Sequence, residues 1–437
     1  MRSVRRRYVF VVLSAAIFGA ALAAAPPGVP ATSKAEDVGM STERLARIHD
    51  AVLKHIDAKD VSGAVSLVAR RGKIVHFEAQ GFADIDAKKP MMKDSIFRLA
   101  SMSKPITAVA VMMMIEEGKI RLTDRVSQFI PEFKSMKVAV AKGTTDKPVQ
   151  MPGFGRGGPP PAPPEFDLVA PTREITVRDL LTHTSGLMSG GVSGAEQNKL
   201  VPRGQSDTLA NYIPKLAQTP LDFQPGTLWR YSGLYGFDVL ARIVEIASGQ
   251  PYDQFLQQHL FTPLGMKDTG FAPAPERMAR VATVYQRTAD GLLRPAPNSN
   301  LLISGTYFSA SGGLMSTAED YLQFAQMLVA GGTLNGKRYL SPKTVELMTS
   351  NATGDMVNGQ FGRPAKGMGF ALGVQVWLDP VAADRRVSAG AFGWEGAYGT
   401  HQVMDPAEKI VEIIMMQGAN GPLQRDFENA VRQAMID

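Results

Sequence analysis

The amino-acid sequence predicts an α/β (α+β) fold in which an antiparallel sheet is flanked by terminal helices and carries an inserted, mostly helical region. Strand-like runs with hairpin signals lie near both ends of the chain, and the middle alternates apolar helical patterns with long loops. Of the 437 residues, 44% are hydrophobic and 20% are charged, which is typical of a globular protein with a large core. We expect a functional site at the seam between the sheet and the inserted region.

The N-terminal elements are expected to be a helix and a β-hairpin. Apolar residues recur at helical spacing over residues 41–58, which is typical of an amphipathic helix. Two strand-like runs follow at 64–70 and 73–80, and the Arg71-Gly72 pair between them favours a tight turn. These two strands would begin the sheet.

The C-terminal elements mirror the N-terminal ones. Residues 400–404 and 410–417 are strand-like, and the Asp405-Pro406 pair between them favours a turn. A helical pattern over 427–435 closes the chain. We therefore expect strands from both chain ends to join in one antiparallel sheet.

The middle of the chain is expected to be mostly helical. The stretch 151–164 is so rich in Pro and Gly that it predicts an irregular surface loop, with a Pro-rich recognition site as the weaker alternative. Apolar helical patterns occur at 105–117, 177–181, 231–247, 252–259, 318–329 and 342–348.

The first 24 residues have the pattern of a signal peptide. A basic head precedes an apolar run over 8–22, and Ala21-Leu22-Ala23 fits a cleavage site. The apolar run is shorter than the ~20 residues that a spanning helix needs, so an uncleaved membrane anchor is the weaker alternative. We expect segment 1–24 to be removed and the protein to be periplasmic or secreted, and Arg6-Arg7 leaves open whether export uses the twin-arginine route.

Charge and residue usage exclude several classes of function. The formal charge of +6 includes four arginines within the first seven positions, and without them the chain has 43 basic and 41 acidic residues. The sequence also has no basic stripe interleaved with aromatic residues, so it does not suggest a nucleic-acid partner. The chain has no cysteine, which excludes disulfides, a cysteine nucleophile and thiolate metal sites. Its six histidines are scattered, so we expect neither a metal nor a cofactor.

The stretch Ser101-Met102-Ser103-Lys104 is the first candidate for chemistry. It lies between a strand-like approach and an apolar run at 106–115 that predicts a buried helix. A serine and a lysine three residues apart share one helical face, where the amine could take the hydroxyl proton. Because Ser-x-x-Lys occurs by chance about once in a chain of this length, and a serine at a helix N-terminus is commonly a cap, the motif needs partners elsewhere.

Two further segments are candidates for such partners. Tyr231 follows a Pro-Gly loop and lies where the chain enters a helical pattern, although a core or capping tyrosine is the simpler interpretation of that segment alone. The glycine-rich stretch 392–400 lies beside a predicted strand, where glycines permit a close approach of backbone to ligand or mark a tight turn. The chain has no Gly-x-Ser-x-Gly, which argues against an α/β-hydrolase elbow, and a Ser-His-Asp triad has no local signature.

Taken together, these segments resemble the serine β-lactamase and penicillin-binding-protein superfamily. The most similar branch is that of the family VIII carboxylesterases, which have the class C β-lactamase fold, and related transesterases. The resemblance extends from about Ala35 to the end and rests on the order and spacing of five stretches: FRLASMSKP at 97–105, ITVRDLLTHTSGL at 175–187, YSG at 231–233, GGLMST at 312–317, and WEG at 394–396 with the following Gly-Thr and Asp-Pro pairs.

The resemblance implies one serine β-lactamase-like catalytic unit over 35–437. Within it, 35–100 together with 365–437 would form the α/β sheet region, and 101–364 the mostly helical region.

The resemblance also implies roles for individual residues. Ser101 matches the acylated nucleophile, Lys104 its lysine partner, and Tyr231 the tyrosine that relays protons with that lysine. The backbone N–H groups of Ser101 and Ala397 match the oxyanion hole. His183, in the Leu-Leu-Thr-His-Thr-Ser-Gly stretch, is interpreted as a structural histidine.

Two departures from β-lactamases bear on the substrate. Gly233 replaces the Asn of Tyr-x-Asn, and Trp394-Glu395-Gly396 replaces the Lys-Thr/Ser-Gly triplet, so these four positions are the candidate substrate-binding residues. The triplet's lysine helps to hold the carboxylate of a β-lactam. If Glu395 faces the pocket, it would repel such a carboxylate; if it faces away, only the missing cation remains as an argument. Trp394 offers an apolar wall for an acyl or aromatic group.

The sequence therefore predicts a serine hydrolase that cleaves carboxylic esters through an acyl-enzyme on Ser101. Its expected partner is a small-molecule ester of undefined acyl chain length, with no cofactor, no nucleic-acid partner and no stable membrane anchor. A β-lactamase or D-amino-acid peptidase is the first alternative, and an inactive penicillin-recognising binding module is the second. The sequence makes no prediction of oligomeric state.

Overall fold

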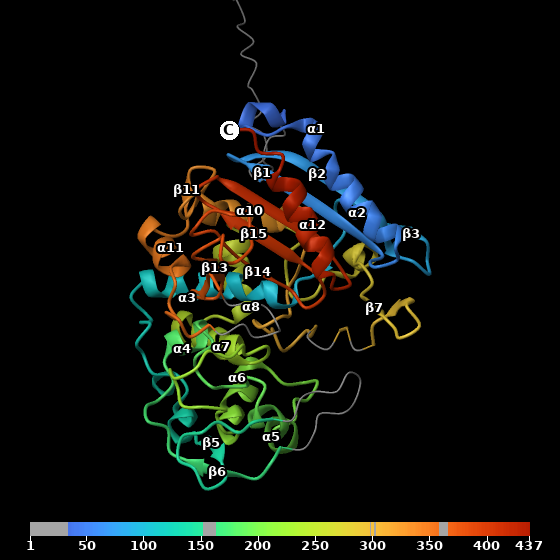
Figure 1. The fold of residues 1–437 in the computed structure, drawn as a ribbon. Coiled ribbons are helices and arrows are strands. Elements are labelled where there is room, and N and C mark those ends of the chain that lie inside the picture. The colour runs from blue at the N-terminus through green and yellow to red at the C-terminus, as the bar shows by residue number, and fades with distance from the viewer. Residues whose placement is uncertain (1–33, 152–162, 298, 301–302, 358–365) are drawn as a thin grey trace, which may run out of the picture.

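The computed structural model describes residues 34–151, 163–297, 299–300, 303–357 and 366–437. Within them, an eight-stranded antiparallel sheet has the order β12-β13-β14-β15-β16-β1-β2-β3 (Figure 1). Its strands are β1 (Gly63–Arg70), β2 (Lys73–Asp84), β3 (Lys89–Pro90), β12 (Met368–Phe370), β13 (Gln375–Trp377), β14 (Phe392–Glu395), β15 (His401–Asp405) and β16 (Ile410–Met416).

The two chain ends meet in the middle of this sheet. Strand β1 pairs with β16 from Ala64 opposite Met416 to Arg70 opposite Ile410. The predicted hairpins at both ends are present as β1–β2 and β15–β16. The predicted fold class, with strands from both ends in one antiparallel sheet, is thus confirmed.

One face of the sheet is covered by the terminal helices. These are α1 (Thr42–Leu45), α2 (Arg47–Asp57) and α12 (Gly421–Arg432). In Figure 1, α1 and α2 follow one another and α12 lies beside them; α2 packs on β1 and β2, and α12 packs on β16. Their apolar side chains form a core cluster with those of Ile410 and Ile414 from β16.

The bounds of the terminal helices differ from the prediction. The single helix expected over 41–58 is divided into α1 and α2 at Ala46. Helix α12 begins six residues before the expected start at 427, because the side chain of Asn420 accepts the N–H of Leu423 and caps the helix there, and Pro422 stands in its first turn.

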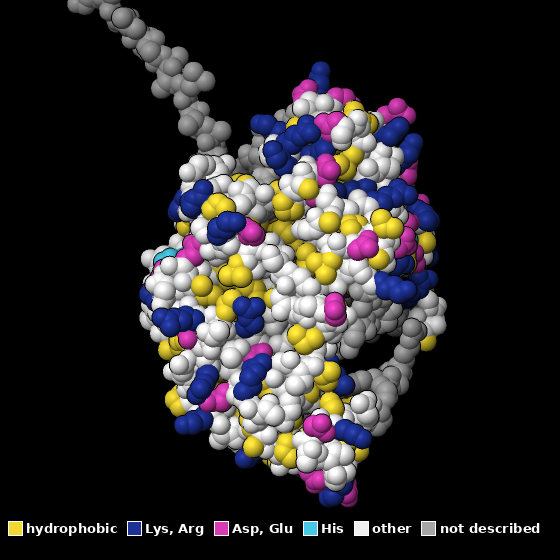
Figure 2. All heavy atoms as spheres, turned by 60° about the vertical axis from the view of Figure 1, so that its left-hand side comes forward, with side chains coloured by type: hydrophobic (Ala, Val, Ile, Leu, Met, Phe, Trp, Pro, Cys, Tyr) yellow, Lys and Arg dark blue, Asp and Glu magenta, His cyan; other side chains and the backbone are white. Residues whose placement is uncertain are grey.

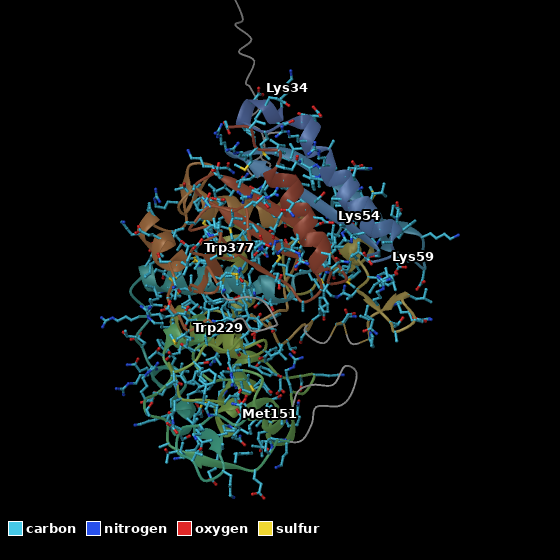
Figure 3. All side chains as sticks on the ribbon, in the orientation of Figure 1. Lys34, Lys54, Lys59, Met151, Trp229 and Trp377 are labelled. Carbon is cyan, nitrogen blue, oxygen red and sulfur yellow. The ribbon has the colours of Figure 1, made fainter. Side chains whose placement is uncertain are left out.

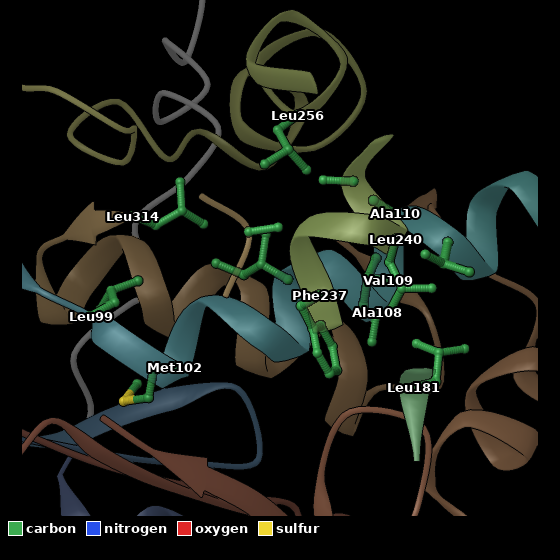
Figure 4. Close-up of a cluster of buried hydrophobic side chains, with 14 of the residues drawn as sticks. Leu99, Met102, Ala108, Val109, Ala110, Leu181, Phe237, Leu240, Leu256 and Leu314 are labelled. Carbon is green, nitrogen blue, oxygen red and sulfur yellow. The ribbon is translucent and has the colours of Figure 1, made fainter. Parts of the chain in front are cut away.

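The opposite face of the sheet packs on α10 (Ala318–Val329), below which lies α3 (Ser103–Glu116). The sequence assigns residues 318–329 to the helical region, yet in the structure α10 contacts β1, β15 and β16. Helix α3 is apolar on all sides and almost entirely buried, in a core that Leu99, Met102 and Leu314 share with Phe237 (Figure 4).

The inserted region lies beyond α3, with α4, α5, α6, α7, β5 and β6 at the end of the molecule away from the sheet (Figure 1). In the view of Figure 3, Trp377 of β13 lies above α3 and Trp229 of the inserted region lies below it. The remaining helices are α4 (Val177–Leu181), α5 (Val192–Leu200), α6 (Leu209–Tyr212), α7 (Gly236–Ser248), α8 (Tyr252–Leu256), α9 (Thr262–Leu264) and α11 (Pro342–Thr349). The remaining strands form pairs: β4 (Phe97–Arg98) with β9 (Met315–Ser316), β5 (Val138–Ala141) with β6 (Phe166–Val169), β7 (Tyr285–Arg287) with β8 (Leu293–Pro295), and β10 (Thr333–Leu334) with β11 (Lys337–Arg338).

One helix of this region starts later than predicted. The helical pattern was expected from Tyr231, but α7 begins at Gly236, and residues 229–235 form a loop. The helix expected over 252–259 is α8 followed by a short π-helical turn, Gln257–Phe261.

Two predicted segments lie outside the described residues: the signal peptide at 1–24, and 152–162 of the Pro/Gly-rich loop at 151–164. In the described part of the chain, no helix is both long and apolar enough to cross a bilayer. On the face drawn in Figure 2, basic and acidic side chains are interspersed rather than gathered by sign.

Candidate active site

Ser101 stands at a sharp turn between a strand and a helix. Strand β4 is held by β9, and the N–H of Leu99 donates to the carbonyl of Leu314 at 2.9 Å. Ala100 then adopts a φ of +46°, in the left-handed region that non-glycine residues rarely occupy. This turn places half-buried Ser101 in a 3-10 turn, Ala100–Met102, directly before α3, where helix N–H groups favour negative charge.

Lys104, one turn along, is completely buried and its ammonium has three partners. Nζ donates to the carbonyl oxygens of Ser311 at 2.8 Å and Gly233 at 3.0 Å, and lies 3.3 Å from Ser101 Oγ. Because the two carbonyls take two N–H groups, the remaining tetrahedral position of the amine faces Ser101 Oγ. In a neutral amine this position would be the lone pair that accepts the hydroxyl proton.

Tyr231, from the inserted region, lies beside Lys104. Its ring centroid lies 4.9 Å from Lys104 Nζ, within the range of a cation–π contact. Its hydroxyl oxygen accepts a hydrogen bond from Trp394 Nε1 at 3.3 Å. Since Tyr231 comes from the loop before α7 and Trp394 from β14, the site lies at the seam between the sheet and the inserted region.

The turn after β14 packs against the approach to Ser101. The hydroxyl of Thr400 donates to the carbonyl of Leu99 at 3.0 Å, and a Cβ on Gly396 would come within 2.2 Å of that same carbonyl oxygen. Glycine is therefore required for this contact. Ala397, next in the chain, is exposed, and its N–H has no acceptor among the described residues.

Ser101, Lys104, Tyr231 and Trp394 all lie within the part of the chain that matches a known protein family. The chain matches the Beta-lactamase family model over residues 49–434. The chain belongs to the beta-lactamase family.

Relatives within the beta-lactamase family include esterases. Esterase EstB of Burkholderia gladioli is 31% identical, over 90% of this chain and 96% of its own length. Protein Rv1367c of Mycobacterium tuberculosis (strain ATCC 25618 / H37Rv) is 37% identical over 83% of this chain and 87% of its own. The solved structure of EstCE1, described as a hydrolase with promiscuous acyltransferase activity, is 28% identical, covers 91% of this chain and 99% of its own, and has a TM-score of 0.72. The resemblance to family VIII esterases is confirmed, and the relatives support a serine hydrolase.

The pairing of β14 with β15 fixes the orientation of the Trp394-Glu395-Gly396 segment. In the β14–β15 register, Glu395 lies opposite His401, and its Oε2 is 3.9 Å from His401 Nδ1. His401 Nε2 contacts Glu428 of α12 at 2.8 Å, so this is the sheet face covered by the terminal helices. Trp394 lies on the opposite face, against Tyr231. The structure therefore does not bring Glu395, one of the predicted substrate-binding residues, to the site.

The other predicted substrate-binding residues have different surroundings. Trp394 contacts Tyr231 and also Phe370, whose ring centroid is 5.2 Å away, and so presents an apolar wall. Gly233 reaches the site through its carbonyl, which holds Lys104. Gly396 acts through its lack of a side chain, as described above.

Two residues near Lys104 were missed from the sequence. Ser311 supplies a carbonyl to Lys104, and its own N–H donates to Asp238 Oδ1 at 2.7 Å. Buried Asp238, on α7, also accepts from the hydroxyls of Tyr307 at 2.8 Å and Ser309 at 3.1 Å, and so organises the loop that holds the lysine. The sequence did contain a signal for Asp238: an acidic residue between Phe237 and Val239 on an apolar helix face is expected to have a buried polar partner.

His183 also contacts the site. Its ring centroid lies 4.6 Å from that of Tyr231, and its Nδ1 accepts the backbone N–H of Ser232 at 3.1 Å. Burial, and secondarily the nearby Lys104 ammonium, hold the pKa of His183 well below its ordinary value, so the ring is neutral. No group of three or more histidine or acidic side chains in the described ranges could hold a metal ion.

Proposed function

We propose that this protein is a serine carboxylesterase that hydrolyses small neutral esters through an acyl-enzyme on Ser101. The observation that carries the proposal is the placement of Lys104 Nζ, held by two backbone carbonyls and directed at Ser101 Oγ across 3.3 Å. Acyl transfer needs four kinds of group: a nucleophile, an adjacent base, a second proton carrier and two backbone donors for the oxyanion.

Acylation begins with the transfer of the Ser101 proton to the Lys104–Tyr231 pair. Ser101 Oγ then bonds to the ester carbonyl carbon, and the carbonyl oxygen becomes an oxyanion that accepts the N–H groups of Ser101 and Ala397. As the tetrahedral intermediate collapses, the bond between the carbonyl carbon and the alcohol oxygen breaks. Tyr231 gives its proton to the leaving alcohol and regains one from Lys104.

Deacylation repeats these steps with water. Water attacks the acyl carbon and its proton passes to the same pair, and Ser101 Oγ recovers a proton as the carboxylic acid leaves. Lys104 and Tyr231 thus return to their starting protonation states.

Selection of a neutral ester is supported by the residues around Tyr231. Where β-lactamases carry the triplet lysine, this chain has Trp394, whose indole contacts Tyr231 and Phe370. The site therefore lacks that cation for a substrate carboxylate and offers aromatic surface to an acyl chain instead. The esterase relative EstB supports the same choice.

One assay tests the proposal against the alternatives. A panel of p-nitrophenyl esters from acetate to palmitate is run beside nitrocefin. We expect turnover of the shorter esters and little hydrolysis of nitrocefin. Nitrocefin hydrolysis with negligible ester turnover would favour a β-lactamase or D-amino-acid peptidase, and stoichiometric labelling without turnover of any ester would favour an inactive penicillin-recognising module.

The nucleophile is tested by mass spectrometry after labelling with an activated phosphonate. Ser101→Ala should abolish labelling. Ser103→Ala is the matched control, because Ser103 is buried two residues away and its Oγ accepts the N–H of Leu314. Undiminished labelling of Ser101→Ala would rule out the assignment.

Transfer of the acyl group to an alcohol is a second candidate activity. It is supported by EstCE1, whose description includes promiscuous acyltransferase activity. In this reaction an alcohol replaces water in deacylation and a new ester leaves. Measuring the ratio of ester to acid formed from p-nitrophenyl butyrate with added 1-butanol would test it; acid as the sole product would exclude it.

A further inference from the structure

His183 holds the chain on both sides of Tyr231. Its backbone carbonyl accepts the N–H of Arg230 at 3.1 Å, and its side-chain Nδ1 accepts the N–H of Ser232 at 3.1 Å. Tyr231 lies between these two hydrogen bonds, in a loop that has no regular secondary structure. One residue of another segment therefore fixes the residue before and the residue after this tyrosine.

The His183 ring is itself immobilised. It is about as buried as a side chain can be, with 1% of the residue exposed. Its centroid lies 4.6 Å from that of Tyr231, 5.0 Å from Phe370 and 5.4 Å from Phe237, and Trp229 meets it edge-on. Close packing of this kind leaves the ring no second rotamer without moving its neighbours.

The hydrogen bond to Ser232 requires a neutral ring with its proton on Nε2. A protonated Nδ1 would place one N–H against another. Burial and the neighbouring Lys104 ammonium both lower the pKa of His183 and so favour the neutral form. Nε2 has no hydrogen-bond partner within the described part of the chain, so Nδ1 makes the only polar side-chain contact seen there.

We propose that His183 is a positioning residue for catalysis: it fixes the Arg230–Ser232 backbone so that the Tyr231 ring stays beside Lys104 and its hydroxyl stays at Trp394. The proposal rests on the proposed function, since it assigns to His183 the task of placing the proton carrier. The sequence indicated only a structural role for His183. The proposal adds a role in catalysis, because the residue that His183 fixes is Tyr231, which lies next to Lys104. A displacement of about 1 Å at such a group can reduce a rate by about 10²-fold.

Two substitutions separate the hydrogen bond from the ring. His183→Phe keeps an aromatic ring against Tyr231 but has no acceptor for Ser232. His183→Asn loses the ring but offers an amide oxygen close to the position of Nδ1, and asparagine tolerates the φ of +59° found here. We expect His183→Phe to lower kcat/KM for an alkyl ester by about 10-fold or more, and His183→Asn to retain more of the activity.

A double-mutant cycle with Tyr231→Phe distinguishes positioning from a merely structural role. If His183 acts through the Tyr231 hydroxyl, His183→Phe should cause no further loss once that hydroxyl is absent. A structural role would lower the melting temperature and the fraction of reactive protein by similar amounts in both backgrounds. Rates are therefore expressed per Ser101 titrated with the phosphonate, and thermal unfolding is measured in parallel.

The rate constant of phosphonate labelling is the second readout. The labelling reaction needs the base that activates Ser101, but it does not need ester turnover. If no ester is hydrolysed, the proposed function fails while the labelling rates still test His183. An equal fold-loss in both backgrounds, or an unchanged rate in His183→Phe, would overturn the positioning role. If His183→Phe does not fold, His183→Gly removes the acceptor without backbone strain and takes its place in the cycle.

Discussion

The indole Nε1 of Trp394 donates a hydrogen bond to the hydroxyl oxygen of Tyr231 across 3.3 Å. This contact joins the sheet to the inserted region at the point where Lys104 lies beside the same tyrosine ring. An N–H that donates to a phenol oxygen stabilises the phenolate more than the phenol. Trp394 thus places an uncharged donor at the Tyr231 hydroxyl.

Trp394→Phe tests this hydrogen bond. Phenylalanine keeps an aromatic wall against Tyr231 and Phe370 and removes the N–H donor. A hydrogen bond to a charged group contributes about 1.5–3 kcal/mol, so we expect kcat/KM for p-nitrophenyl butyrate to fall by roughly 10- to 100-fold, with the melting temperature little changed. An unchanged kcat/KM would show that the indole N–H does not take part.

Gly396→Ala tests the contact between the β14–β15 turn and the approach to Ser101. The added methyl would meet the Leu99 carbonyl oxygen and Thr400 Oγ1, both at 2.2 Å, so the turn that carries Ala397 would have to move. We expect a loss in kcat of about 10²-fold, as for the removal of one oxyanion donor. Gly305→Ala is the matched control, since a Cβ added there would have no atom within 4 Å and the rate should equal that of the parent.

Glu395→Gln tests the orientation of the Trp-Glu-Gly segment. Because Glu395 lies on the α12 face near His401, its charge is separated from the substrate by the sheet. We expect kcat/KM for neutral esters to change by less than about 2-fold and nitrocefin hydrolysis not to rise. A gain of nitrocefin hydrolysis would show instead that Glu395 repels substrate carboxylates.

Glu412→Gln tests a buried acid behind the sheet. Glu412 of β16 is completely buried, and Arg432 is shared between it and Asp405. Burial raises the pKa of Glu412 from 4.5 to about 7. Between these values the folded protein binds more protons than the unfolded chain, so this residue lowers stability as pH rises through the window, and its full cost is present above about pH 7.

Glu412→Gln removes that titration while keeping the shape of the side chain. We expect the variant to melt a few degrees higher than the parent near pH 8 and at a similar temperature near pH 4.5. Scanning calorimetry at several pH values measures both. Exposed Glu132→Gln should follow the parent, and a Glu412→Gln curve with undiminished pH dependence would contradict the assignment.

Local spacing accounts for the part of the site that could be predicted. A serine and a lysine three residues apart at the start of an apolar helix lie together in the structure because helix geometry alone sets their separation. The antiparallel sheet could be predicted for a similar reason, since each hairpin is signalled by its own turn residues.

Features that depend on distant partners could not be predicted. Residues 231–235 carry a helical pattern but form a loop, because Ser232 gives its N–H to His183 and Gly233 gives its carbonyl to Lys104. The direction of Glu395 depends on the pairing register of β14 with β15, which the sequence of one strand does not define. The partners of His183 follow from tertiary packing that no local pattern reports.

The pairing of β1 with β16 has a consequence for biosynthesis. Strand β16 lies between β1 and β15, so the sheet has no continuous hydrogen-bonded path from the first hairpin to β14 until residues 410–416 are in place. A nascent chain can therefore form local helices early but cannot complete the sheet that places Trp394 beside Tyr231 until residues 410–416 have been translated. Truncation before the end of β16 should leave a polypeptide with an incomplete sheet and no active centre, however intact Ser101 and Lys104 remain.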